Sequence, residues 1–80
     1  MALIEDLANA LSGDVIKAMT ETGDDRLHER VAKSIGAMSP TMEEAFMTSM
    51  RVRLAERRGR QFFDSELSKL RTERAAAKKE

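Results

Sequence analysis

The longest helix-compatible stretch of the sequence, Thr41 to Arg74, carries two apolar stripes that point in different directions. At about 100° per residue, one stripe follows the first half of the stretch and the other follows the second half, roughly on the opposite side. The first contains Met42, Phe46, Met50 and Leu54, with Met47 at its edge, and the second contains Phe63, Leu67 and Leu70 with Val52, Gly59 and Arg74. A straight helix with two opposed stripes needs two packing partners.

Two chain paths satisfy this pattern. Either the helix breaks near Gly59 and its last part folds back as a fourth helix, or one continuous helix packs its second half on another molecule. Glycine costs only about 1 kcal/mol inside a helix and its neighbours here are good helix formers, which favours the continuous path. Such a helix would be about 50 Å long, more than one small domain can cover. It begins with Ser39 capping and Pro40 as first helical residue, or with Thr41 capping and Glu44 closing a capping box.

Two shorter helices precede this stretch. The first is predicted over residues 2–22, ending at Gly23, and the second over residues 26–37, with Asp24 or Asp25 as its cap. The first apolar face contains Ile4, Leu7, Ala8, Leu11, Val15, Ala18 and Met19, and the second contains Leu27, Val31, Ile35 and Met38. The pattern predicts an all-α bundle of three helices in a single domain over residues 1–80, with residues 75–80 frayed.

The totals restrict this picture further. The chain has 80 residues, no cysteine, six methionines and 4% aromatic residues. A monomer of this size buries only about 60–65% of its unfolded surface, and a methionine-rich core is adaptable, so folding that depends on a partner is expected. The missing cysteines exclude disulfides and thiolate metal sites. No apolar run is long enough to span a membrane and Glu5-Asp6 argues against a signal peptide, so a cytoplasmic protein without membrane contact is predicted.

Charge is unevenly distributed although the net charge is zero. Residues 1–50 carry four bases against nine acids, a net of −5, and residues 51–80 carry ten bases against five acids, a net of +5. This asymmetry favours self-association or an acidic partner such as nucleic acid.

The corner between the second and third predicted helices, residues 31–47, resembles a helix-turn-helix motif. Ala32 is the small residue that faces the partner helix, Gly36 makes the turn, and Ile35, Met42 and Ala45 anchor the following helix. The resemblance implies nucleic-acid binding through the corner. A plain helical corner with a glycine has the same pattern.

The start of the third helix argues against reading of a DNA groove by this corner. It presents Glu43 and Glu44, and the first base after them is Arg51. Two carboxylates aimed at a phosphate-lined groove are repelled, although a glutamate can accept a hydrogen bond from cytosine.

Arginines cluster between residues 51 and 60, and Arg51, Arg57, Arg58 and Arg60 are predicted to bind a partner. Glu56 can pair with Arg53 and Arg60, whereas Arg51, Arg57 and Arg58 have no acid three or four residues away. Arginine beside an apolar seam is typical of an interface anchor for carboxylate or phosphate groups. The alternative is a solvated helix face, or a basic helix that binds nucleic acid.

The apolar residues that follow are Phe62, Phe63, Leu67 and Leu70, predicted to form an oligomer interface. The first two helices can cover the first stripe of the third helix, which leaves this second stripe for a homodimer or another protein. The alternative is the core of a fourth helix that folds back.

Catalysis has little support, because the single histidine, His28, has no evident partner in sequence and no phosphate loop, metal spacing or nucleophile motif is present. No catalytic residue, cofactor or metal site is predicted. The expected function is a small non-enzymatic regulator, adaptor or inhibitor that binds a larger protein or complex. Accessory proteins of bacteria, phages and mobile elements have this general profile. The alternative is a helix-turn-helix-like regulator that binds nucleic acid.

Overall fold

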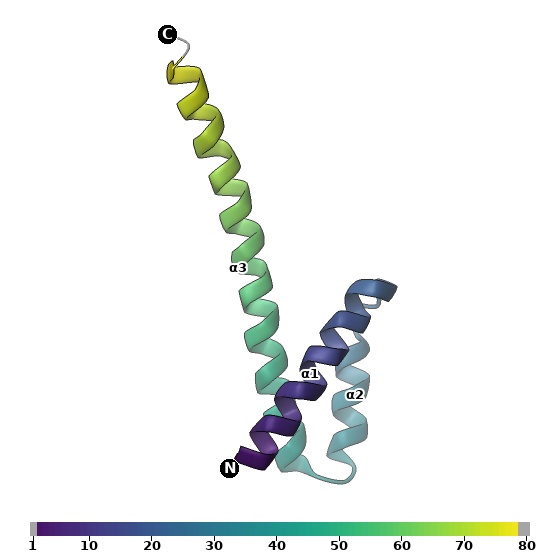
Figure 1. The fold of residues 1–80 in the computed structure, drawn as a ribbon. Coiled ribbons are helices and arrows are strands. Elements are labelled where there is room, and N and C mark those ends of the chain that lie inside the picture. Colours follow the sequence, from purple (N-terminus) through teal and green to yellow (C-terminus); the bar gives the residue numbers. More distant parts are fainter. Residues whose placement is uncertain (1, 79–80) are drawn as a thin grey trace.

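The chain forms three α-helices, and the computed structural model describes residues 2–78. Helix α1 spans Ala2–Thr22, α2 spans Leu27–Gly36 and α3 spans Pro40–Lys78. Helix α2 returns from the end of α1, and α3 crosses the first half of α1 before continuing alone (Figure 1). No residue of the described chain lies in a strand, so the predicted all-α class is confirmed.

The helices end where the sequence provides a specific signal. Gly23 has φ +76° and donates its N–H to the carbonyl of Met19 at 2.9 Å, which closes α1 in a conformation that favours glycine. At the start of α3, Ser39 Oγ accepts the N–H of Met42 at 3.1 Å, and Pro40 is the first helical residue. Of the two predicted starts, the Ser39 cap is therefore the one that forms.

The predicted carboxylate cap of α2 takes a different form. The N-cap position of α2 is Arg26, which makes no side-chain capping bond, and Asp24 accepts the Arg26 N–H at 3.1 Å two residues earlier. Asp24 also pairs with Arg30, and this hydrogen bond is the largest cause that lowers the pKa of the Asp24 carboxyl below its ordinary value. Asp24 thus stabilises the turn before the helix.

A small core lies where α1, α2 and the first part of α3 meet. Phe46 and Met50 of α3 are fully buried, as the first stripe predicts. Met42 and Leu54 are partly buried against the same core. The remaining buried apolar residues are Ala8, Val15, Met19 and Ala32. Only one of the six buried apolar side chains, Phe46, is aromatic and two are alanines, so the core is thin and depends on close helix packing.

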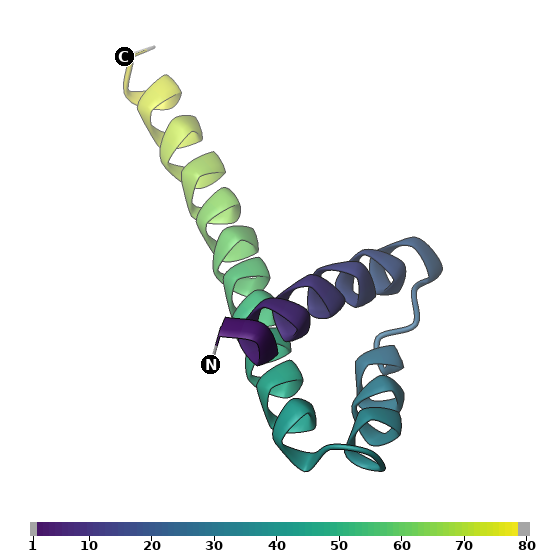
Figure 2. The ribbon, with the colours of Figure 1, turned by 60° about the horizontal axis from the view of Figure 1, so that its bottom comes forward.

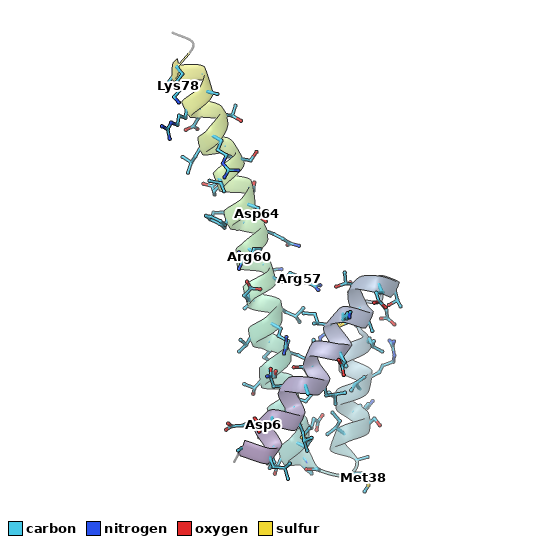
Figure 3. All side chains as sticks on the ribbon, viewed as in Figure 1. Asp6, Met38, Arg57, Arg60, Asp64 and Lys78 are labelled. Carbon is cyan, nitrogen blue, oxygen red and sulfur yellow. The ribbon has the colours of Figure 1, made fainter. Side chains whose placement is uncertain are left out.

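Three residues depart from the predicted faces. Leu7 is 52% exposed and Met38 is 90% exposed, so neither belongs to the core that its stripe predicted. Met38 lies after the end of α2, in the corner, and its side chain points away from the bundle (Figure 3). Ser12 is completely buried instead, in the middle of the apolar face of α1.

Helix α3 is continuous through Gly59, which decides between the two predicted chain paths. A Cβ atom at Gly59 would meet nothing within 4 Å, so the chain passes this position in open space. The molecule measures 64 × 28 × 14 Å with a radius of gyration of 18.1 Å, against about 12 Å for a compact chain of this length. Figure 2 shows the second half of α3 standing clear of α1 and α2.

The predicted fraying of residues 75–80 stays a prediction. Residues 75–78 continue α3 as regular helix, because three alanines and a lysine are strong helix formers. Residues 79–80 lie outside the described part of the chain.

Candidate protein-binding surface on α3

The projecting part of α3, residues 58–78, is called the arm here. Arg57 is the last residue of α3 that hydrogen-bonds to α1, and Leu54 is the last that packs against the core. The arm contacts neither of the other helices in either view (Figures 1 and 2). Whatever covers its apolar side chains must therefore come from outside the described residues.

The apolar seam of α3 is defined as Val52, Phe62, Phe63, Leu67 and Leu70. Four of its members, all but Leu67, are between 55% and 68% exposed. At about 100° per residue, Val52, Phe63 and Leu70 fall within about 20° of one line along the helix, roughly opposite the line of Phe46 and Met50. The two predicted stripes are thus present, and only the first is covered.

The predicted partner-binding arginines divide into two groups. Arg51 and Arg58 are exposed, and neither forms a hydrogen bond or ion pair with another described residue. Arg60 donates to Glu56 at 3.0 and 3.2 Å, and Arg57 donates to Thr20 of α1 at 2.5 Å. Figure 3 shows Arg57 reaching from α3 toward α1, with Arg60 and Asp64 farther along the helix. Of these four arginines, Arg51 and Arg58 are therefore the two without a partner among the described residues.

Arg51 and Arg58 lie close to the seam. At about 100° per residue both fall about 100–120° to one side of the Val52–Phe63 line, which is the side of Phe62. Arg58 lies one turn before Phe62, and Arg51 adjoins Val52. An arginine that borders exposed aromatic surface can offer its guanidinium and its apolar stem to the same partner. Cation and seam therefore form one continuous surface.

Arg53 has a role that sequence reasoning missed. Its Nε donates to Ser12 Oγ at 3.0 Å, and its Nη2 donates to the carbonyl and the side-chain oxygen of Asn9 at 3.0 and 2.7 Å. Ser12 Oγ also lies 2.6 Å from Ser49 Oγ. Gly13 leaves space for the guanidinium, since a Cβ there would lie 3.2 Å from Arg53 Nη2.

This clasp between α1 and α3 corrects one expected pairing. Glu56 pairs with Arg60, and Arg53 turns to α1. A polar Ser12-Gly13 pair inside an otherwise apolar face is the signal that could have indicated a polar contact with another helix. The clasp holds α3 on the bundle just before the arm begins.

The corner between α2 and α3 packs closely. Ala32 is 4% exposed and faces the core, as the helix-turn-helix resemblance implies. A Cβ atom at Gly36 would collide with the carboxylate of Glu43, so the glycine leaves room for that side chain. Glu44 is exposed on the first turns of α3. Ala32 therefore packs as the pattern predicts, and the first turns of α3 expose a carboxylate.

A shallow, mainly apolar groove lies between the start of α1 and the start of α3. It is lined by Ile4, Glu5, Ala8, Thr41, Glu44, Ala45, Thr48 and Ser49. The groove is open to solvent. It lies on the bundle, apart from the seam.

His28 is half-buried, and its Nδ1 atom is buried without a hydrogen-bond partner. Among the described residues, no group of three or more histidine, cysteine, aspartate or glutamate side chains is placed to hold a metal ion. The structure brings no second titratable side chain into a hydrogen bond with His28.

Comparison of the chain with protein-family models, curated proteins and solved structures found no match. Within residues 2–78, no helix combines the length and the apolar character that crossing a bilayer requires.

Proposed function

We propose that this protein is a small non-enzymatic regulator, adaptor or inhibitor that acts by binding another protein through the arm. The observation that carries the proposal is the exposed seam on a helix that projects from its own bundle. We place the protein in the cytoplasm, because a chain without cysteine suits a reducing compartment.

The physical chemistry of an isolated helix supports a protein partner. A helix of about 20 residues without tertiary contacts is marginal in water, and most helix stability in proteins comes from packing of an apolar face. The arm has good intrinsic propensity and two intrahelical ion pairs near or within it, Arg60–Glu56 at 3.0 Å and Lys69–Glu66 at 3.4 Å. Burial of two phenylalanines and three aliphatic residues against a partner would add the missing stabilisation.

The charges beside the seam favour protein over nucleic acid. Arg51 and Arg58 can pair with carboxylates at the edge of such an interface. Among its six bases the arm also carries three acids, Asp64, Glu66 and Glu73, and phosphate groups would repel these acids. A helix with mixed charges around exposed phenylalanine and leucine is typical of a protein-docking helix.

The test compares the proteins recovered from native extract by the wild type and by a variant with Phe63→Asp and Leu70→Asp. We expect a defined partner to be recovered with the wild type and lost with the variant, because two carboxylates would be buried in the apolar contact. Both positions are exposed, so the variant should keep its helical circular dichroism and its unfolding midpoint. A matched control, Met38→Asp, changes an exposed apolar residue of the corner and should retain the partner.

The competing nucleic-acid function gives a different result. It predicts binding of arbitrary duplex DNA that weakens steeply with salt and is lost in Arg51→Glu with Arg58→Glu, but not in the Phe63 and Leu70 variant. That outcome, or equal recovery of the partner by wild type and variant, would contradict the proposed function.

A further inference from the structure

We propose that a second copy of this chain covers the seam, with the two arms antiparallel and related by a two-fold axis at Phe62. The inference rests on the proposed function, since it takes the arm to be a protein-binding surface and names one protein that binds it. The reasons are the order of the charges along α3, their positions around the helix, and the place of Gly59.

Six of the eleven charged residues between Arg51 and Glu73 are arranged symmetrically about Phe62 with opposite signs. In an antiparallel pair centred there, each residue faces the one equally far from Phe62 on the other copy. Arg60 and Asp64 are each two residues away, Arg58 and Glu66 four, and Arg51 and Glu73 eleven. Each of the three bases therefore faces an acid, and the symmetry repeats each pair to make six.

The positions of the paired charges around the helix also fit the antiparallel arrangement. An antiparallel pair with a perpendicular two-fold axis brings the same flank of each helix together. At about 100° per residue, Arg51, Arg58, Glu66 and Glu73 all lie on one flank of the Val52–Phe63 line, whereas Arg60 and Asp64 both lie on the other. Every facing pair therefore shares a flank.

A parallel pair lacks this match. In register, it would place each residue beside its own counterpart, so that Arg58 faces Arg58 and Glu66 faces Glu66. Like charges across an interface oppose association. The charge order thus selects the antiparallel arrangement.

The same register interleaves the side chains along the seam. Phe63 of the second copy lies at the height midway between Gly59 and Phe63 of the first copy. Leu70 of the second copy lies midway between Val52 and Glu56 of the first copy. A Cβ at Gly59 would have nothing within 4 Å in the single chain, which leaves room there for an aromatic ring. Side chains of each helix would therefore pack into the spaces between side chains of the other helix, as knobs into holes.

The overlap runs beside the bundle at each end. Helix α1 contacts α3 as far as Arg57. At about 100° per residue, Arg53 and Arg57 lie on the flank opposite to Arg51 and Arg58, so α1 leaves those two arginines uncovered. The opposed segment from Arg51 to Glu73 is about 33 Å long at 1.5 Å per residue. One like-charged pair remains, Arg53 facing Arg71, and the guanidinium of Arg53 is already held by Asn9 and Ser12.

Charge reversal tests the register. The full-length variants Arg58→Glu and Glu66→Arg are each compared with the wild type and with the double variant by sedimentation equilibrium over a range of concentrations. We expect a wild-type dimer of two 9.0 kDa chains that dissociates on dilution. Each single reversal should raise the dissociation constant about tenfold or more, because the two-fold axis repeats each new repulsion. The double variant should restore the wild-type constant.

The controls separate register from folding and from net charge. Positions 58 and 66 are about 12 Å apart along one helix, so recovery in the double variant cannot come from contact within a chain. Lys33→Glu makes the same change of net charge on the exposed surface of α2 and should leave the dimer intact. Helical circular dichroism checks that every variant is folded.

Two results would overturn this inference. A wild type that stays monomeric at all concentrations would do so, as would a dimer whose constant the double variant does not restore. If the wild type is a monomer and the Phe63→Asp and Leu70→Asp variant no longer recovers the partner protein from extract, the proposed function still holds. A dimer with the expected register that recovers no other protein would support the dimer and contradict the role as a regulator of a larger protein.

Discussion

At the scale of single residues, the contact that joins the two parts of the molecule is the Arg53 clasp. Three hydrogen bonds from one guanidinium hold Asn9 and Ser12 of α1, and Ser12 is fully buried between the helices. Hydrogen bonds that involve a charged donor are stronger than neutral ones and leave a buried acceptor unsatisfied when the donor is removed. Arg53 therefore fixes how α1 crosses α3.

We expect Arg53→Met to lower the free energy of unfolding by about 1–3 kcal/mol, because methionine keeps the apolar stem and loses all three hydrogen bonds. Urea unfolding followed by circular dichroism measures this change. Arg71→Met is the matched control in the exposed arm and should change stability by less than about 0.5 kcal/mol. Equal effects at the two positions would show that the clasp contributes nothing to stability.

At the scale of elements, α3 is one helix with two environments. Its first part packs on the bundle and its second part has only its own propensity and intrahelical ion pairs. The bundle supplies the nucleus that an isolated helix would have to form at a cost, and the arm extends from it. Two glycines of the chain differ in conformation: Gly59 lies in the regular helix of α3, whereas Gly23, after the end of α1, has φ +76°.

Alanine substitution at these two glycines should have opposite effects. Gly23→Ala should lower the free energy of unfolding by about 1 kcal/mol or more, since a side chain is strained at positive φ. Gly59→Ala should raise helical content and stabilise α3 by about 0.5–1 kcal/mol. In the antiparallel dimer its methyl group would meet Phe63 of the second copy, so the gain in helicity should accompany a weaker dimer. Thermal unfolding and sedimentation measure the two effects separately, and a loss of helicity in Gly59→Ala would argue against a continuous α3.

At the scale of the whole molecule, stability and binding lie in different parts of the chain. All the buried core residues lie between Ala8 and Met50, and no described residue beyond Arg57 contacts α1 by a hydrogen bond. An antiparallel dimer would place the two bundles at opposite ends of the paired arms. Such an arrangement suits an adaptor that engages two sites at once.

Shortening the chain to residues 1–60 should therefore remove association and keep a folded bundle. We expect cooperative unfolding with a midpoint close to that of the full-length chain measured as a monomer, because the core and the Arg53 clasp are retained. Thermal unfolding and sedimentation of both chains measure this. Loss of the cooperative transition would mean that the arm supports the bundle within one chain.

Periodicity alone predicted most of the fold. It placed α1 at residues 2–22, selected the face of Phe46 and Met50 as core, and identified a second stripe through Phe63 and Leu70. It assigned Leu7 and Met38 to the core wrongly, because a helical stripe is wider than the surface that a thin bundle covers and a residue past a helix end leaves the stripe. The two-stripe pattern of α3 required an external partner or a fold-back, and periodicity could not choose between them.

What the sequence determined by itself is local: the three helices, the stop signal at Gly23, the N-cap at Ser39, and the order of charges about Phe62. These depend on propensities, caps and spacing, which neighbouring residues decide. Only the tertiary structure decided that α3 passes straight through Gly59, that Arg53 and Arg57 are held by α1, and that Arg51 and Arg58 remain available. Those outcomes depend on where α1 crosses α3, and that crossing is set by the packing of residues about 40 positions apart, which no local pattern contains.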